Sequence, residues 1–157
     1  MEAGEVVVPT EVRLRFVAAD DLPVFYAHQS DPVAAAMAGF VSRSRPAFDA
    51  HWQRILARSD CAVRTVEVDG VTAGYVSTFA REGQREIAYW IGRPHWGQGV
   101  ASRAVVAFLD MVGKRPVFAS VMASNHRSIA VLRHAGFAWV ETVAGADGVA
   151  EQVFRLG

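Results

Sequence analysis

The residues best placed to do chemistry form a short glycine-rich segment, WGQGVA at residues 96–101, between an expected strand and an expected helix. Unpaired backbone N–H groups at the start of a helix point outward and attract anions, and the helix dipole adds to this attraction. Glycines let a phosphate approach the backbone closely. The segment therefore predicts a phosphate-binding turn, although Gly-x-Gly alone also fits an ordinary turn before a helix.

Two common phosphate-binding loops do not fit this segment. The P-loop requires Gly-Lys followed by Ser or Thr, and that triplet is absent from the chain. The dinucleotide-binding loop requires a third glycine where this chain has Ser102, and an acidic residue at the end of the next strand, which here reads Ala123-Ser124-Asn125. A nucleotide-binding protein is therefore disfavoured and stays as a minor alternative.

Periodicity predicts the elements that must position this loop. Alternating apolar residues predict strands, and the stripe of Phe48, Trp52, Ile55 and Leu56 predicts an amphipathic helix. Asp69-Gly70 between two β-branched runs is the strongest hairpin signal. The expected strands are 11–17, 61–68, 71–79, 85–91, 116–123, 137–143 and 149–156, and the expected helices are 20–29, 44–59, 100–113 and 124–136.

This order of elements predicts one mixed α+β domain over residues 1–157, with residues 1–10 as a loose N-terminal segment. We expect a mostly antiparallel, twisted sheet of six or seven strands flanked by about four helices. The passage from strand 85–91 through helix 100–113 to strand 116–123 is the one expected parallel crossover. Residues 33–44 fit either a helical turn or a loop over a groove.

Composition limits the classes of partner. Sixteen Lys and Arg balance sixteen Asp and Glu, which disfavours a protein that binds nucleic-acid phosphates. Residues 1–80 hold 7 basic against 10 acidic residues, whereas residues 81–157 hold 9 against 6, so the second half suits an anionic ligand better. With a single cysteine, no signal-like start and no long apolar run, we expect a cytoplasmic protein without a membrane span. The histidines show no metal-ligand spacing, so no metal is expected.

Three blocks together resemble the GNAT superfamily of acetyl-CoA-dependent N-acetyltransferases, and more narrowly its ribosomal-protein N-terminal acetyltransferase branch. They are the strand REIAYWI at 85–91, the loop at 96–101, and NHRS at 125–128 leading to Gly136-Phe137. The loop of that family usually begins with Gln or Arg, where this chain has Trp96. The resemblance implies a GNAT fold, acetyl-CoA as cosubstrate, and a primary amine as acceptor, either a protein N-terminus or a small molecule, in a monomer or homodimer.

The resemblance also implies roles for particular residues. The loop would hold the CoA pyrophosphate through its backbone, and the strand end at Trp90–Gly92 would pair with the pantetheine arm and bind the acetyl carbonyl. Asn125 would bond the pantetheine or a water. The residues expected to bind the cosubstrate are Trp90, Ile91, Gly92, Trp96, Gly97, Gln98, Gly99, Val100, Ala101, Ser102, Asn125 and Ser128.

Catalysis requires a base for the amine and a proton for the leaving thiolate. Glu86 matches the place where some family members carry a carboxylate base, and its alternative is a solvated carboxylate paired with Arg85 or Arg13. Many family members have a Tyr seven residues after the Asn, where this chain has Leu132. Ser128 is the candidate donor, with a hydroxyl of no chemical role as its alternative.

Two residues of the 33–44 segment complete the expected site. By the resemblance, Met37 and Phe40 would lie beside the acceptor groove, and core packing is the alternative. Without the family's Tyr, a CoA-binding module or regulator that does not turn over is the rival to an acetyltransferase.

Overall fold

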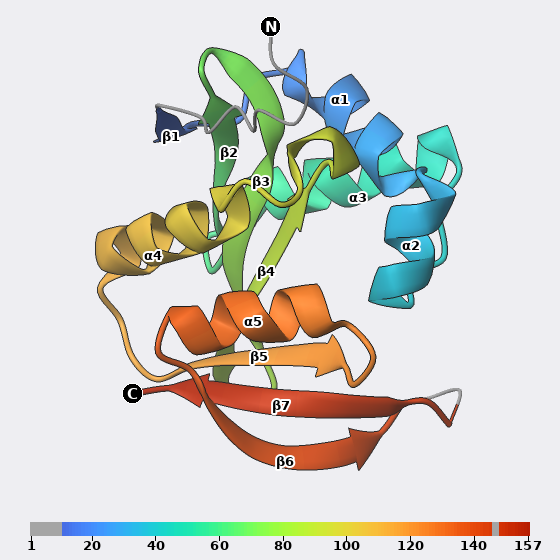
Figure 1. The fold of residues 1–157 in the computed structure, drawn as a ribbon. Helices are drawn as coiled ribbons and strands as arrows, with labels where there is room; N and C mark the ends of the chain where they lie inside the picture. Colours follow the sequence, from blue (N-terminus) through green and yellow to red (C-terminus); the bar gives the residue numbers. More distant parts are fainter. Residues whose placement is uncertain (1–10, 146–147) are drawn as a thin grey trace, which may run out of the picture.

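The computed structural model describes residues 11–145 and 148–157, so the expectation for residues 1–10 falls outside the described residues. Seven strands form one sheet, and helices lie on both of its faces (Figure 1). The strands are β1 Val12–Arg15, β2 Ala62–Val68, β3 Val71–Arg81, β4 Gln84–Ile91, β5 Val117–Met122, β6 Ala138–Ala144 and β7 Ala150–Leu156. The helices are α1 Asp21–Gln29, α2 Pro32–Ala38, α3 Arg45–Ala57, the 3₁₀ turn Arg93–His95, α4 Val100–Val112 and α5 His126–His134.

The sheet has the order β1-β2-β3-β4-β5-β7-β6. Every neighbouring pair is antiparallel except β4 and β5, which are joined through α4. The expected mixed fold with one parallel crossover is therefore confirmed. The described residues form five α-helices instead of about four, because part of the open segment 33–44 is helical: the Asp31 carboxylate accepts from the N–H of Val33 and starts α2.

Local signals set most element ends as expected. Asp69 and Gly70 have φ of 47° and 84°, the left-handed pair that a tight hairpin turn requires. The Ser44 hydroxyl accepts from the N–H of Ala47 at the start of α3, and Gly113, with φ of 66°, ends α4.

An aspartate at the start of a helix often caps it with its side chain, but α1 starts differently. Asp20 precedes the helix without a side-chain cap, whereas Asp21 is buried and accepts hydrogen bonds from Arg15, the Ala18 N–H and Thr65. Burial alone would raise the pKa of Asp21, but these hydrogen bonds outweigh it and hold the pKa well below its usual range. Asp21 therefore anchors α1 to β1 and β2 instead of only capping it.

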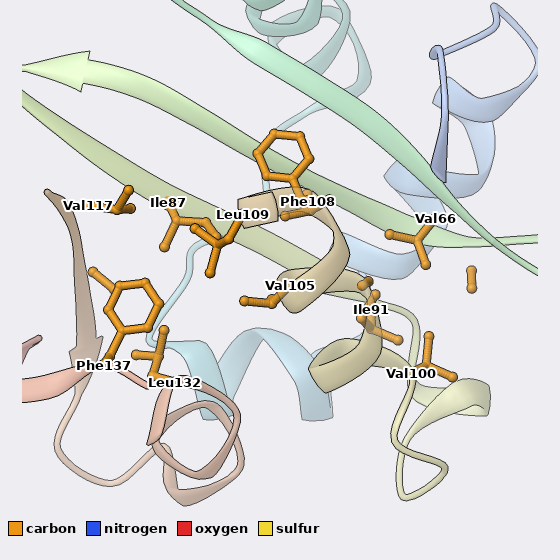
Figure 2. Close-up of a cluster of buried hydrophobic side chains, with 14 of the residues drawn as sticks. Val66, Ile87, Ile91, Val100, Val105, Phe108, Leu109, Val117, Leu132 and Phe137 are labelled. Carbon is orange, nitrogen blue, oxygen red and sulfur yellow. The ribbon is translucent and has the colours of Figure 1, made fainter. Parts of the chain in front are cut away.

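Two hydrophobic cores lie on opposite faces of the sheet. The larger core packs α4 and α5 against the sheet, and Figure 2 shows Val105, Phe108 and Leu132 among its side chains. The smaller core joins α1 and α3 to the other face through Phe25 and Trp52. Burial on both faces fixes the central strands and holds the first turn of α4 at one end of β4.

The sheet separates between β4 and β5, which is the feature that creates the site. The register of these two strands contains a single pair, Glu86 with Phe118. Beyond it, β4 continues to Ile91 and β5 continues to Met122 without pairing. Figure 1 shows β5, β7 and β6 running across the direction of β2, β3 and β4. One edge of β4 is therefore open to a ligand over residues 87–90, whereas the carbonyl oxygen of Ile91 accepts from the Trp96 side chain.

Candidate functional site

A cavity of about 340 Å³ lies where β4 ends and α4 and α5 begin. Its walls come from the second half of β4, the loop before α4, the first turns of α4 and α5, and α2. The sequence blocks at 85–91, 96–101 and 125–128, which are far apart along the chain, are thus brought to one groove. This groove is called the loop cavity below.

The glycine-rich segment forms one wall of the loop cavity. Gly97 and Gly99 both have φ of 74°, a left-handed conformation that strongly favours glycine. Gly99 precedes Val100, the first residue of α4, and brings no side chain to cap the helix. The N–H groups of the first turn of α4 are therefore available to an anion in the cavity.

Ten of the twelve residues expected to bind the cosubstrate line this cavity. Two expected residues do not line it. Gln98 is not part of the wall, and Gly92 packs against the ring of His28, which leaves no room for a side chain there. The residues that line it as expected are Trp90, Ile91, Trp96, Gly97, Gly99, Val100, Ala101, Ser102, Asn125 and Ser128.

A second cavity, of about 220 Å³, opens between the diverging strands. Its walls are Ile87–Tyr89 of β4, Ala119–Met122 of β5, the end of α2, and the start of β7 with the residue before it. This space is called the strand cavity below. It shares Ala38, Tyr89, Asn125 and Ser128 with the loop cavity, so the two cavities meet at these residues.

Two hydroxyl groups lie at the junction of the cavities. The Tyr89 hydroxyl is 2.5 Å from Ser128 Oγ and 3.3 Å from the Ser128 carbonyl oxygen. Asn125 fixes the same turn, because its Oδ1 accepts from the Ser128 N–H at 3.2 Å. Burial raises the pKa of Tyr89 to about 12, so its phenol is neutral at physiological pH. The junction thus offers neutral hydrogen-bond donors and no charge of its own.

Glu86 lies apart from both cavities. It is buried at the end of β4 where β4 still pairs with β5, and its Oε2 is 2.8 Å from Nε of Arg81. Alternation along β4 places the Glu86 side chain on the face opposite Ile87 and Ile91, which enter the main core. The carboxylate is paired with an arginine, as in the alternative to a base, but it is buried instead of solvated, and its partner is Arg81 instead of Arg85 or Arg13.

Among the residues that the structure describes, Glu151 is the one carboxylate on the wall of the strand cavity. It lies on β7 opposite Met122 of β5. No ion pair joins Glu151 to a residue in the described parts of the chain. The sequence alone does not single out Glu151, because nothing in the local pattern of β7 relates it to the glycine-rich loop at 96–101.

The expected acceptor residues separate into two positions. Met37 lines the loop cavity from α2. Phe40 lines neither cavity, and its ring instead packs edge-on against the ring of Trp90 at 5.3 Å between centroids. Phe40 therefore contacts Trp90, which lines the loop cavity, without lining that cavity itself.

Leu132 occupies the place where the resemblance expects a Tyr, and it is fully buried. It packs in the main core near Phe137 (Figure 2) and lines neither cavity. Any hydroxyl that acts at the junction therefore comes from another position, and Ser128 and Tyr89 are the ones present.

The described residues show no cluster of three or more His, Cys, Asp or Glu side chains that could hold a metal ion. Over the same residues, no helix combines the length and the apolar character needed to cross a membrane. The junction and the strand cavity offer backbone groups, hydroxyls and one carboxylate for chemistry.

Comparison with known proteins matches residues 11–138 to the model of the acetyltransferase (GNAT) domain family. A comparison with curated proteins found no match. Among solved structures, RimL, an alpha-N-protein acetyltransferase of a ribosomal protein in complex with coenzyme A, superposes with a TM-score of 0.81 at 19% identity. The superposition covers 96% of each chain.

Two further solved structures share the fold. The microcin C7 self-immunity acetyltransferase MccE, in complex with acetyl-CoA and AMP, has a TM-score of 0.76 at 17% identity over 94% of this chain and 92% of that one. The aminoglycoside acetyltransferase AAC(6')-Ib, in complex with coenzyme A, has a TM-score of 0.75 at 20% identity over 91% and 94%. At these identities the likeness establishes a common fold and leaves the acceptor open.

Proposed function

Since the chain belongs to the GNAT family of acetyltransferase domains, we propose that it transfers an acetyl group from acetyl-CoA to a primary amine. The observation that carries the proposal is the meeting of two cavities at Tyr89, Asn125 and Ser128. One cavity suits the cosubstrate and the other admits an acceptor from a different direction. The thioester would lie at the junction.

The loop cavity has the features that coenzyme A requires. The N–H groups beside Gly99 suit the pyrophosphate, and the unpaired edge of β4 can pair with the amide groups of the pantetheine arm as an added strand would. The same edge offers a backbone N–H near Trp90 to the acetyl carbonyl oxygen, which gains negative charge as the amine attacks.

The strand cavity supports Glu151 as the base. The nitrogen of the neutral amine attacks the carbonyl carbon, the bond from that carbon to sulfur breaks, and the nitrogen loses a proton. Glu151 is the carboxylate on the acceptor side, whereas Glu86 is held by Arg81 outside both cavities. We therefore favour Glu151 over Glu86, acting directly or through a water.

The pair of hydroxyls supports Ser128 as the donor to the thiolate sulfur. When the Tyr89 phenol donates to Ser128 Oγ, the serine proton is free to point at the junction. The sulfur either takes the Ser128 proton, which a proton from solvent then replaces on Ser128 Oγ, or leaves as a thiolate that accepts a hydrogen bond from Ser128 and is protonated by solvent. Tyr89 is a positioning residue in this scheme, because it acts through Ser128.

Replacing Tyr89 with phenylalanine tests this pair. We expect Tyr89→Phe to lower kcat by about five- to tenfold, the value of one hydrogen bond, while the Kd for acetyl-CoA stays unchanged. Tyr75→Phe is the matched control: burial also raises the pKa of its phenol to about 12, its hydroxyl accepts from Gln29, and the half-buried side chain lines neither cavity. Equal losses of kcat in the two variants would remove Tyr89 from the reaction.

The rival function is a module of the same fold that binds acetyl-CoA without turnover, which the absence of a Tyr at position 132 favours. Release of the CoA thiol, measured with a thiol reagent in the presence of N-terminal peptides or small primary amines, separates the two. We expect release that depends on the acceptor and on Ser128, with Ser128→Ala slower. Tight binding of acetyl-CoA with no release for any acceptor would instead support the rival.

A further inference from the structure

Trp96 and Arg127 form a contact on the wall of the loop cavity. Trp96 follows the 3₁₀ turn, and Arg127 is the second residue of α5. Arg127 Cζ lies over the indole ring, 4.8 Å from its centroid. Both side chains line the cavity together with Gly97 and Gly99. A cation is therefore held next to the glycine-rich loop by a residue of that loop.

Other contacts hold the indole ring in place. The Trp96 Nε1–H donates to the carbonyl oxygen of Ile91 at 2.8 Å, and the ring packs against the main core. The Trp96 N–H also donates to the Arg93 carbonyl within the 3₁₀ turn. The ring is thus a firm surface for the guanidinium, in a range where a cation–π contact is favourable.

The charge of Arg127 is not balanced by the cavity. In the described parts of the chain, no Asp or Glu lines the loop cavity, and Arg127 is its one Lys or Arg. The other basic wall residue, His95, has its pKa lowered by burial and is neutral at physiological pH. Over the residues that the structure describes, Arg127 forms no ion pair with a carboxylate.

A guanidinium that lies over an aromatic face keeps the N–H groups of its edge free to donate. Such an edge matches two oxygens of a phosphate at once, which an ammonium group cannot do. Val100, Ala101 and Ser102, whose N–H groups begin α4, line the same cavity as Arg127. The surroundings of Arg127 therefore favour a phosphate ester or anhydride as its partner.

We infer that Arg127, positioned by Trp96, binds the pyrophosphate of coenzyme A. The inference rests on the proposed function for the identity of the ligand. It also accounts for Trp96, which stands where the loop of the family usually has Gln or Arg. In this chain the polar contact to the pyrophosphate comes from Arg127 of α5, and the loop supplies the Trp96 ring that positions Arg127.

Calorimetric titration with coenzyme A and with dephospho-coenzyme A, which lacks the 3′-phosphate, tests the inference without turnover. We expect Arg127→Gln to weaken binding of both compounds about tenfold, with a smaller dependence of Kd on salt. Arg133→Gln is the matched control, because it removes an exposed arginine from the same helix outside both cavities, and it should leave the Kd unchanged. Unchanged affinity in Arg127→Gln, or a loss confined to coenzyme A, would overturn the pyrophosphate contact.

A second variant tests the role of the ring. We expect Trp96→Leu to weaken binding, and Trp96→Leu combined with Arg127→Gln to bind no more weakly than Arg127→Gln alone, because the ring acts through the arginine. Additive losses would contradict the positioning role. Thermal unfolding shows whether each variant is folded. If the unaltered protein binds neither compound, the proposed function itself fails, which is distinct from a failure at Arg127.

Discussion

Replacing Gly99 with valine is expected to weaken acetyl-CoA binding by at least about 100-fold, or roughly 2.7 kcal/mol. Gly99 has φ of 74°, which a β-branched residue adopts only with strain. Relieving that strain rotates the peptide groups that lead into α4 and turns their N–H groups away from the anion. The valine side chain would also stand in open space on the wall of the loop cavity, because no atom lies within 4 Å of a Cβ at this position.

A matched control at the other end of the same helix separates binding from stability. Gly113 has φ of 66°, and the nearest atom to a Cβ there is 3.9 Å away, so valine meets a similar backbone strain without a clash. Gly113 lines neither cavity. We expect Gly113→Val to lower the Tm about as much as Gly99→Val and to keep the wild-type Kd in calorimetry. A wild-type Kd in Gly99→Val would show that the loop does not hold the cosubstrate.

The order of elements followed from the sequence because its signals are local. Asp69-Gly70, Ser44 and Gly113 each act within a few residues, through a turn or a helix end that few residue types allow. The loop at 96–101 was likewise readable, since its glycines and the helix after it are adjacent in the chain. Most of the loop cavity was predicted for this reason.

The strand cavity was not predictable in the same way. Alternation along β4 determines which face of the strand carries Glu86, but whether Glu86 reaches the site depends on where β4 and β5 separate. That point is set by the twist of the whole sheet and by the packing of α2 against the opening, which no window of sequence contains. Glu86 and Phe118 form the single pair between β4 and β5, so Glu86 lies where the two strands are still joined.

Packing also explains why position 132 supplies no proton donor in this chain. A tyrosine there could turn its hydroxyl toward the thioester, whereas leucine fills the main core with Phe137. The hydroxyls at the junction come from Tyr89 on β4 and Ser128 on α5, which lie 2.5 Å apart only because the strand and helix converge. The sequence showed that the usual donor was missing, and the fold showed which groups occupy the junction.

The second large effect is expected at Glu151, whose replacement by glutamine should lower kcat by about 100-fold. Glutamine keeps the size of the side chain and its acceptor oxygen but cannot take the proton that the attacking amine must lose. Because Glu151 lines the strand cavity and not the loop cavity, the Kd for acetyl-CoA should stay unchanged. Steady-state rates with an identified acceptor, together with calorimetric titration of acetyl-CoA, give both quantities.

Glu86→Gln is the comparison that assigns the base to one carboxylate. Glu86 is paired with Arg81 at the closed end of β4, so its replacement is expected to reduce stability and to leave kcat within about twofold of the wild-type value. A loss of kcat in Glu86→Gln but not in Glu151→Gln would reverse the assignment and restore the base that the sequence alone favours. If both variants turned over at the wild-type rate, neither carboxylate would be the base, and the amine would have to lose its proton to solvent in the strand cavity.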